Sequence, residues 1–373
     1  MVSALVPHNS RITKKATVRA PESRHLETAV ASPKGVPASQ HEPTDIRLGR
    51  IMRLLMENAT VVVSGTKIAQ EISSNRFEVW RLIQQLRGLG VDVAGHPATG
   101  YQLRTVPDLL LPEILQRLIR GTIFDSHLHH YYKIGSTNVT AMSAAADGAP
   151  EGSVFLAEEQ TAGRGRGANA WHSERSAGIY CSVLLRPVLP PSHVLVLSLA
   201  AGLAVGEAIR QMDSRVQIDL KWPNDVLIGG KKVCGILTEM NSEIMQVRYI
   251  VVGIGINVNH ASFPEDLVGL ATSLRLESGS EWSRVELAAA LLKSLHREYR
   301  EFLEEADAKK SILRRFAERS SWVIGKVVRI EDGGSDFEGA CEGTTEGLDE
   351  RGFLRVRTTQ GMRTVLSGTV REK

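Results

Sequence analysis

Apolar residues in the first patterned part of the chain recur at helical spacing. From Asp45 this spacing predicts one helix, and Ser64 is placed to cap a second, shorter helix. After a break, a third helix is expected to open at Asn75. Two short helices joined by a tight turn, followed by a two-stranded ribbon around Gly100, are typical of a winged helix-turn-helix. The pattern therefore predicts such a domain over residues 45–106.

The helix-turn-helix itself is expected to begin at Val61 and end at Trp80, and its second helix is basic. The functional interpretation is that this helix enters a major groove of DNA, with Arg76 or Arg81 near base edges or phosphates. The alternative is a helical module used only for packing or dimerisation. Exposed arginines favour DNA, because phosphates suit them better than a core does.

Strands and helices alternate through residues 107–320, which predicts an α/β domain. Residues 154–157 and 178–185 have the continuous apolar texture of buried strands, and the first strand of the domain is expected at residues 131–134. Two further strands are expected within residues 218–228, separated by a turn at Pro223, and others at residues 231–239 and 249–252. Helices are expected at residues 139–146, 198–212, 286–303 and 312–316.

The two ends of the chain have different textures. Beyond Trp322, short strands and glycine turns predict a small β-barrel over residues 321–373, with one strand at residues 337–339. Residues 1–44 carry basic side chains, Pro and Ser without a periodic apolar pattern, which indicates a disordered tail. A DNA-binding arm and a transit peptide are alternatives for this tail.

Composition narrows the function classes. Hydrophobic residues make up 42% of the 373 residues and charged residues 23%, so a folded globular protein is expected. A net charge of +3 does not by itself indicate nucleic acid. The three cysteines lie far apart without metal-ligand spacing, so a reduced cytoplasmic setting is expected and no residue is assigned as a metal ligand. No apolar run reaches about 18 residues, so no membrane partner is expected.

The most informative chemical motif is the stretch Gly-Arg-Gly-Arg-Gly-Ala-Asn-Ala-Trp at residues 163–171, called the basic loop below. Its glycines let the backbone approach a ligand, and Arg164 and Arg166 bring fixed positive charge, which suits a phosphate or carboxylate. A disordered RNA-binding segment and a plain surface loop are alternatives. The flanking buried strands favour a loop anchored on an ordered core.

Other candidate residues follow predicted strands. Ser136 and Thr137 can cap the next helix, whose free N–H groups could also meet a ligand. Lys221 and Asp225 cluster around a turn fixed by Pro223, and Lys232 opens an apolar strand, where a lysine is most often only a solvated strand end. Glycines at residues 253 and 255 again permit close approach to a ligand.

The order of these motifs closely resembles the bifunctional biotin–protein ligase and biotin-operon repressor family. The resemblance covers the chain from Asp45 to Lys373 and leaves out only the tail. It is carried by the helix-turn-helix and wing, Ser-Thr-Asn at 136–138, Gly-Arg-Gly-Arg at 163–166, Lys-Trp-Pro-Asn-Asp at 221–225, Lys-Val-Cys-Gly-Ile-Leu at 232–237, Gly-Ile-Gly-Ile-Asn at 253–257 and the terminal barrel.

The resemblance implies a central mixed sheet of the biotin/lipoate ligase type and an SH3-like terminal barrel. It implies that biotin and ATP, with Mg²⁺, form biotinyl-adenylate, and that a lysine of the biotin carboxyl carrier protein of acetyl-CoA carboxylase receives the biotinyl group. It also implies operator DNA as a partner and a homodimer when the adenylate is bound.

The resemblance also implies a set of site residues. The catalytic residues would be Lys232, Arg166, Lys221 and Asp225. Biotin would be bound by Ser136, Thr137, Asn138, Gln160, Arg164, Gly165, Arg166, Lys232 and Gly235. ATP would be bound by Arg166, Trp171, Lys221, Asn224 and Asn257.

Two positions depart from the family pattern. Gly167 stands where the family often has a further arginine, which is expected to weaken retention of the adenylate, and Gly135 stands where an aspartate is common. Three rival functions stay open: a lipoate or octanoate ligase, a ligase whose helix-turn-helix no longer binds DNA, and a ligand-sensing transcription factor with an inactive catalytic domain.

Overall fold

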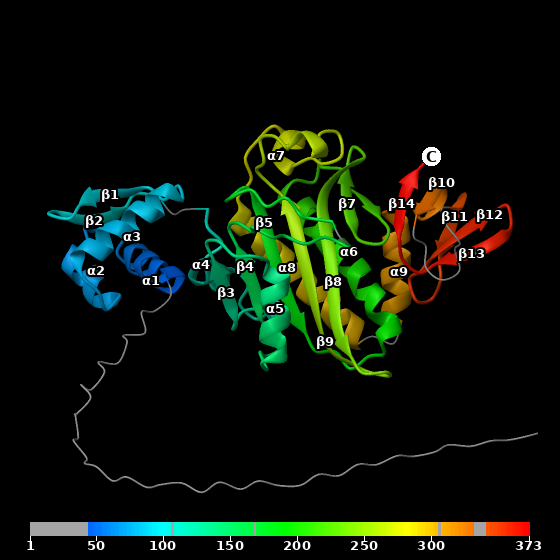
Figure 1. Ribbon diagram of the computed structural model, residues 1–373, viewed down its shortest axis with the longest axis horizontal. Helices are drawn as coiled ribbons and strands as arrows, with labels where there is room; N and C mark the ends of the chain where they lie inside the picture. Colours follow the sequence, from blue (N-terminus) through cyan, green and yellow to red (C-terminus); the bar gives the residue numbers. More distant parts are fainter. Residues whose placement is uncertain (1–43, 106–107, 168, 305–306, 332–340) are drawn as a thin grey trace, which may run out of the picture. The chain divides into compact units, whose positions relative to one another are not determined.

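The computed structural model describes residues 44–373 except 106–107, 168, 305–306 and 332–340 (Figure 1). Nearly all of the predicted disordered tail and the strand predicted at residues 337–339 lie outside the described residues.

The first domain is a three-helix unit with a two-stranded antiparallel wing, as the apolar pattern predicts. Its elements are α1 (Thr44–Glu57), α2 (Gly65–Glu71), α3 (Arg76–Gly88), β1 (Val93–His96) and β2 (Gly100–Leu103). Ser64 caps α2 by accepting from the backbone N–H of Lys67 at 3.1 Å, and Asn75 caps α3 by accepting from that of Glu78 at 2.9 Å. The caps fix the turn between the two helices.

The central domain is built on a seven-stranded sheet in the order β3-β4-β5-β9-β8-β7-β6. Only β3 and β4 run parallel, so the sheet is mixed. The strands are β3 (Leu128–Tyr131), β4 (Val154–Ala157), β5 (Gly178–Leu185), β6 (Asp219–Lys221), β7 (Asp225–Ile228), β8 (Lys231–Ser242) and β9 (Val247–Asn257).

Helices cover both faces of this sheet (Figure 1). On one face lie the long helices α6 (Val194–Met212), α8 (Arg284–Glu304) and α9 (Ala308–Glu318), and α4 (Pro112–Leu118) packs against α8. On the other face lies α5 (Thr137–Ala146), which contacts β4, β5 and β9. The short helices η1 (Pro191–His193), η2 (Glu265–Leu267) and α7 (Leu274–Ser278) lie in connections.

Alternation along the strands decides what each face carries. In β9, Ile250, Val252, Ile254 and Ile256 join the core under α6 and α8, while Val251 joins a smaller cluster with α5. Because successive side chains of a strand point to opposite faces, Gly253 and Gly255 belong to the α5 face. That face therefore offers bare backbone next to the first turn of α5.

One helical segment, residues Pro191–Met212, is long and apolar enough to cross a membrane by length and composition, with a mean hydropathy of 1.7. However, 78% of its most apolar window is buried inside the protein, where α6 packs on β8, α8 and α9. In this structure it is the central helix of a globular core.

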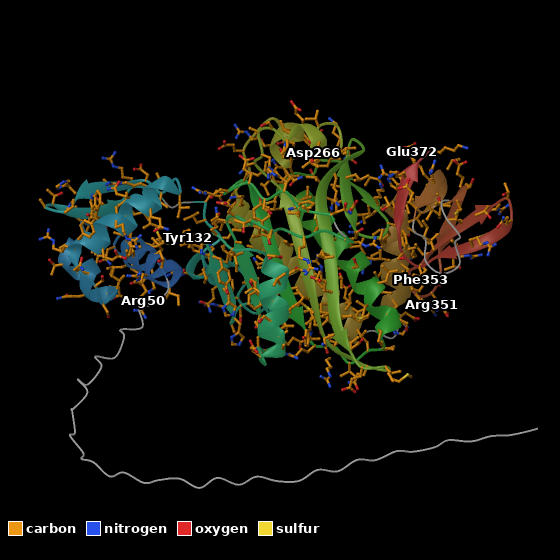
Figure 2. The ribbon with its side chains drawn as sticks, in the orientation of Figure 1. Arg50, Tyr132, Asp266, Arg351, Phe353 and Glu372 are labelled. Carbon is orange, nitrogen blue, oxygen red and sulfur yellow. The ribbon has the colours of Figure 1, made fainter. Side chains whose placement is uncertain are left out.

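The last domain is a five-stranded antiparallel sheet in the order β13-β12-β11-β10-β14. Its strands are β10 (Ile324–Glu331), β11 (Cys341–Leu348), β12 (Leu354–Thr358), β13 (Gly361–Val365) and β14 (Thr369–Glu372). The buried indole N–H of Trp222 donates to the carbonyl of Gly352 at 2.9 Å, which ties this sheet to the turn before β7. Figure 2 labels the neighbours of Gly352: the guanidinium of Arg351 lies 5.1 Å from the ring centre of Phe353.

Two strand boundaries differ from the prediction. The first strand of the sheet ends at Tyr131, where the sequence predicts its start, and β9 continues to Asn257 instead of ending at Val252. The extension occurs because Gly255 pairs with Tyr180 on one side and Gly235 on the other, so glycines that suggest a loop are held in a ladder. The candidate ligand-binding glycines therefore lie within the sheet.

A buried ion-pair network fixes the segment that leads into the central domain. The guanidinium of Arg284, at the start of α8, lies 2.7 Å from the carboxylate of Glu158 and 3.1 Å from that of Asp108. Asp108 also accepts from the backbone N–H groups of Arg284 and Val285, so it caps α8. Glu158 further accepts from the N–H of Leu110 at 2.9 Å. The network joins residues 108–110 to both β4 and α8.

Electrostatics holds Glu158 ionised inside this network. Burial alone would raise the pKa of Glu158, but the charge of Arg284 and the hydrogen bonds from His130 and Leu110 outweigh it and lower the pKa from 4.5 to about 2. Glu158 and Arg284 are almost completely buried, so each needs the other to remain charged there.

We predict that Glu158→Gln lowers the free energy of unfolding by about 3–5 kcal/mol, because it leaves the Arg284 charge buried without its nearest carboxylate. Thermal and urea unfolding measure the loss. The matched control is Glu243→Gln, which removes an exposed ion pair with Arg248 and should cost less than about 1 kcal/mol. The wild-type contribution is present above pH 4.5 and is lost as pH falls toward 2, so this part of the acid destabilisation should be missing from Glu158→Gln.

Candidate active site

A pocket opens on the α5 face of the central sheet, between the first turn of α5 and the basic loop. It draws together most of the residues that the sequence singled out. Those that line it are Ser136, Thr137, Asn138, Gln160, Arg164, Gly165, Arg166, Trp171, Asn224, Lys232 and Gly235.

The floor of the pocket is bare backbone from β8 and β9. Gly235 and Gly255 are paired across these strands, and the indole of Trp171 lies directly on both. A Cβ added to Gly255 would come within 2.5 Å of the Trp171 ring, and one added to Gly235 within 2.7 Å. A Cβ at Gly253 would overlap the amide of Asn138. Glycine at these positions is therefore required by the side chains that lie over the sheet.

Polar side chains are interlocked at the N-terminus of α5. Ser136 is the N-cap residue, but its side chain makes no capping hydrogen bond, contrary to the prediction. Instead, the side-chain carbonyl of Gln160 accepts from the backbone N–H of Thr137 at 2.8 Å. Asn138 donates to Glu239 at 2.9 Å and accepts from the hydroxyl of Ser182 at 2.6 Å. This wall presents amide and hydroxyl groups in fixed positions.

The basic loop closes the opposite side, and each of its arginines already has a partner. Arg164 pairs with Glu239 at 3.3 Å. Arg166 lies 3.4 Å from both the side-chain carbonyl of Asn224 and the backbone carbonyl of Gly368 in the last domain. Burial lowers the pKa of Arg166, and nearby Asp225 opposes that effect. Two guanidinium groups are thereby held at the mouth of the pocket.

Both departures from the family pattern occur where the structure has space around the residue. Gly167 has a φ of +64°, in the left-handed region that favours glycine, and an added Cβ would meet nothing within 4 Å. Open space likewise surrounds Gly135. The backbone therefore explains glycine at 167, while nothing in the structure explains glycine at 135.

Lys232 contacts both the glycine floor and the carboxylate of Asp225. Its ammonium nitrogen lies 2.7 Å from the carboxylate of Asp225 and 5.5 Å from the ring centre of Trp171. The cation lies near the edge of the bare floor because the aliphatic part of Lys232 packs beside Gly235. A lysine at a strand start is here a half-buried, paired charge.

Three predicted site residues do not line the pocket. Asp225 reaches it through Lys232. Asn257 is buried and donates to the carbonyl of Thr272 at 3.1 Å. The ammonium of Lys221 lies 4.2 Å from the ring centre of Trp322, and burial lowers the pKa of Lys221 despite the opposing charge of Asp225. These three residues therefore lie behind the residues that line the pocket.

Sequence reasoning missed Tyr180, which lines the pocket, and also Ser182 and Glu239, which do not line it but hydrogen-bond Asn138. Ser182 and Tyr180 are embedded in the apolar β5, and Glu239 lies far along β8. A polar residue on the α5 side of a buried strand is a usable signal for Ser182, since an unpaired hydroxyl there would be costly. Gly368, by contrast, contributes only a backbone carbonyl, which cannot be predicted from the pattern of side chains in the sequence.

Three family models match the chain in the order of its domains. A helix-turn-helix domain model matches residues 47–102, the biotin/lipoate A/B protein ligase family model matches residues 133–257, and a biotin protein ligase C-terminal domain model matches residues 323–371. The central match contains the basic loop, the floor glycines and Lys232.

Whole-length relatives agree with these matches. The chain is 34% identical over 322 residues to the bifunctional ligase/repressor BirA of Bacillus spizizenii, which covers 86% of this chain and 97% of the relative. It is 34% identical to the biotin--[acetyl-CoA-carboxylase] ligase of Mycobacterium tuberculosis, covering 66% of this chain and 91% of the relative. The biotin protein ligase from Aquifex aeolicus, solved in complex with biotin and ATP, is 30% identical, with a TM-score of 0.57, covering 66% of this chain and all of that one.

We predict that Gly255→Ala destabilises the central domain by about 1–3 kcal/mol, because the new methyl group displaces the Trp171 ring. Thermal unfolding midpoints measure the effect. In a Trp171→Ala background the same substitution should cost less than about 0.5 kcal/mol, since the clashing ring is gone.

The control for this cycle is Gly202→Ala in α6, where an added Cβ meets its neighbours only at 3.6 Å or more. It should leave the midpoint unchanged or raise it. Equal losses for Gly255→Ala with and without Trp171 would disprove the contact between ring and floor as the reason for glycine.

Proposed function

The chain belongs to the biotin protein ligase family of the bifunctional ligase/repressor type, and from this we propose that it joins biotin to a lysine of a biotin carboxyl carrier protein at the expense of ATP. The observation that carries the proposal is the pocket itself. Three cationic side chains, Arg164, Arg166 and Lys232, meet there over a floor of bare backbone.

The first step requires those cations. A carboxylate oxygen of biotin forms a bond to the α-phosphorus of ATP, and the bond from that phosphorus to the bridging oxygen breaks to release pyrophosphate. Both reactants are anions, so repulsion opposes their approach. Lys232 is the cation assigned to the biotin carboxylate and the α-phosphate, and Arg166 is assigned to the phosphates. Their charges stabilise the transition state.

Biotin is proposed to occupy the interlocked end of the pocket. Its ureido group is polar and has to be satisfied when buried. Ser136, Thr137, Asn138 and Gln160 supply the hydroxyl and amide partners, while Arg164, Gly165 and Gly235 border the rest of the molecule. The hydrogen bond of Gln160 to the N–H of Thr137 supports this assignment, since it holds the recognition groups in place before biotin arrives.

ATP is proposed to lie on the side of Trp171 and Asn224. The indole of Trp171 covers the adenine, and Asn224, next to Arg166, faces the ribose and phosphates. Asn257 acts as a positioning residue, because its amide lies 3.5 Å from the carbonyl of Lys232. Lys221 contributes positive charge from behind the turn.

Mg²⁺ is proposed to enter with ATP. The nearby carboxylates, Asp225 and Glu239, are each paired with a cation of the protein, so oxygens of the phosphates are the main ligands available to the metal. When bound, Mg²⁺ neutralises part of the phosphate charge. Of the two carboxylates, Asp225 is better placed to bind Mg²⁺, because its partner Lys232 is proposed to contact the substrates instead.

In the second step the carrier lysine attacks. Its amine forms an amide bond with the biotinyl carbonyl carbon, the bond from that carbon to the phosphate oxygen breaks, and AMP leaves. The amine must lose a proton, and Asp225 is assigned to orient it and accept that proton. The basic loop excludes water from the adenylate during this exchange. We place this reaction in the cytoplasm.

We predict that the protein, incubated with biotin, ATP, Mg²⁺ and a biotin carrier domain, adds one biotinyl mass to the carrier lysine. Lys232→Ala should lower kcat/KM for adenylate formation by about 10²–10³, since a contact made to the developing charge is lost. Mass spectrometry and pyrophosphate release measure the two effects.

Lys231→Ala is the matched control for this assay, because Lys231 is the exposed neighbour on the same strand and should change the rate less than about twofold. Transfer of lipoate or octanoate in place of biotin would favour the rival lipoate ligase. Failure to modify any carrier would favour a sensor without catalysis.

We further propose that the winged helix-turn-helix binds operator DNA as a biotin-responsive repressor. The N-terminal turns of α3 carry Arg76 and Arg81, which are engaged with the wing carbonyl of Pro97 and with Glu78 respectively. On DNA these guanidinium groups would exchange those partners for phosphates or base edges. A homodimer formed when the adenylate is bound would present two such helices to two half-sites.

We predict that DNA from upstream of biotin-synthesis genes is shifted more strongly with biotin and ATP present than without them. Arg81→Ala should weaken binding and lower the salt dependence by about one phosphate contact. Arg248→Ala, at an exposed position near the start of β9 in the central domain, is the control. Equal affinity with and without biotin and ATP would remove the repressor role and leave the ligase.

A further inference from the structure

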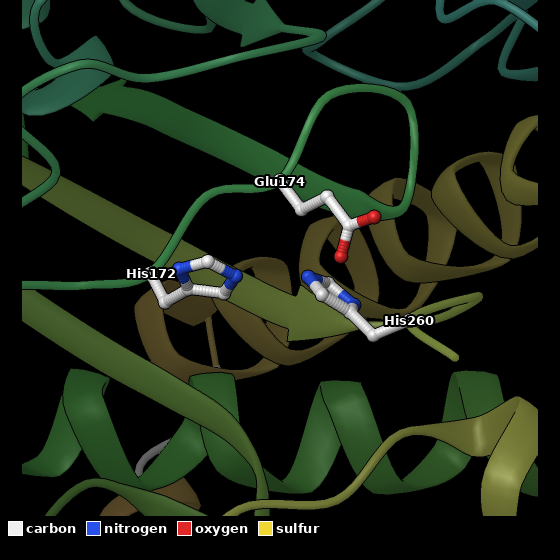
Figure 3. A group of neighbouring side chains, drawn as sticks. All are labelled: His172, Glu174 and His260. Atoms are coloured by element: carbon white, nitrogen blue, oxygen red, sulfur yellow. The ribbon is translucent and has the colours of Figure 1, made fainter. Parts of the chain in front are cut away.

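A second cluster of chemically capable side chains lies directly after the basic loop. His172 and Glu174 follow Trp171 in the chain, and His260 comes from the segment after β9. One ring nitrogen of each histidine and a carboxylate oxygen of Glu174 all lie within 4.8 Å of one another. Figure 3 shows the two imidazoles and the carboxylate facing a common point. The roles proposed above use none of these residues.

The hydrogen bonds of His260 leave one of its ring nitrogens unused. The hydroxyl of Tyr180 donates to the backbone carbonyl of Glu174 at 2.7 Å, so its oxygen is left to accept from Nε2 of His260 at 3.4 Å. That assignment puts the ring proton on Nε2 and leaves Nδ1 with a bare lone pair. Among the described residues, Nδ1 is buried without a hydrogen-bond partner, and His260 as a whole has no exposed surface.

Histidine binds a metal through one ring nitrogen that carries no proton, and its other nitrogen usually donates to an oxygen, which fixes the ring. One ring nitrogen of His260 lies within 4.8 Å of the ligand atoms of His172 and Glu174.

The environment also holds His260 in place. Its ring is stacked on Phe263 with centroids 5.2 Å apart and an interplanar angle of 12°, and the ring centre of His172 lies 5.9 Å away. The side chain of Glu174 is exposed. Small rotations of Glu174 and His172 would bring the three atoms to the separation of about 3.3 Å that ligands of a tetrahedral metal have at bonds near 2.0 Å.

We propose that His172, Glu174 and His260 form a binding site for a divalent transition metal, with Zn²⁺ as the best fit. Two imidazoles and one carboxylate are a donor set of zinc sites that keep a fourth position for water. Mg²⁺ is a poor fit, because it prefers an octahedron of oxygens. The site is separate from the Mg²⁺ that accompanies ATP.

The position of this site suggests a conformational role. Metal binding would join residues 172–174 to the segment after β9, on either side of the floor where Trp171 lies. It would thereby restrain the C-terminal end of the basic loop without contacting either substrate. The metal proposal rests only on the geometry of the three side chains and holds whether or not the ligase assignment does.

The test uses the full chain, stripped of metal with a chelator, and titrated with Co²⁺ and Zn²⁺. We expect one equivalent of Co²⁺ to give the visible absorption typical of four-coordinate cobalt. Zn²⁺ should displace the Co²⁺ and should raise the Tm of the protein. His172→Ala should weaken metal binding on the order of 100-fold, and Glu174→Gln about 10-fold. The reason is that mutating even a residue that only hydrogen-bonds to a metal ligand typically lowers metal affinity 10–100-fold.

The matched control is His127→Ala, which removes an exposed histidine from the same domain and should leave binding unchanged. His172→Ala and Glu174→Gln change side chains that are not buried, so circular dichroism should show an intact fold. Absence of Co²⁺ absorption in the wild type would overturn the proposal. Undiminished binding in His172→Ala and Glu174→Gln would equally overturn it, because the metal would then be held elsewhere.

Discussion

The structure of the pocket depends on the close approach of side chains to bare backbone. Gly235, Gly253 and Gly255 lie on the same face of two paired strands, and Trp171 and Asn138 rest on them where any Cβ would intrude. The indole of Trp171 can rest on the sheet only because Gly235 and Gly255 have no side chains. Lys232 comes near that ring because the aliphatic part of its side chain packs beside Gly235. Placement of the cations thus follows from the absence of side chains beneath them.

A second constraint is that positive charges near the pocket have protein partners before any ligand binds. Arg164 has Glu239 and Lys232 has Asp225. Pairing lets the half-buried Lys232 remain charged in the folded protein, because an uncompensated buried charge would destabilise it. It also means that an anionic ligand must replace existing contacts, so selectivity arises from a competition between carboxylates of the protein and phosphates of the substrate.

Much of this could be predicted from the sequence. The helix-turn-helix followed from helical spacing and two capping residues, and the central strands from continuous apolar runs. The basic loop and Lys232 were identified by residue type and family resemblance. The features that could not be predicted depend on contacts between residues far apart in the sequence. The Arg284 network joins residues 126 and 176 positions apart, and its members are isolated charges in the sequence. The extension of β9 was missed because glycines weaken strand propensity, while the ladder on both sides overrides it. His172 and His260 are 88 positions apart, so only the fold reveals them as neighbours.

The contact between Arg166 and the carbonyl of Gly368 spans 202 positions in the chain. During translation the arginine leaves the ribosome well before the glycine, and at ordinary rates of 5–20 residues per second the interval is roughly 10–40 s. The glycine floor and the cations over it belong to strands synthesised earlier, so they can assemble first. The outer anchor of the basic loop is therefore added last, and a nascent chain that has already formed its floor is still without the closure of its mouth.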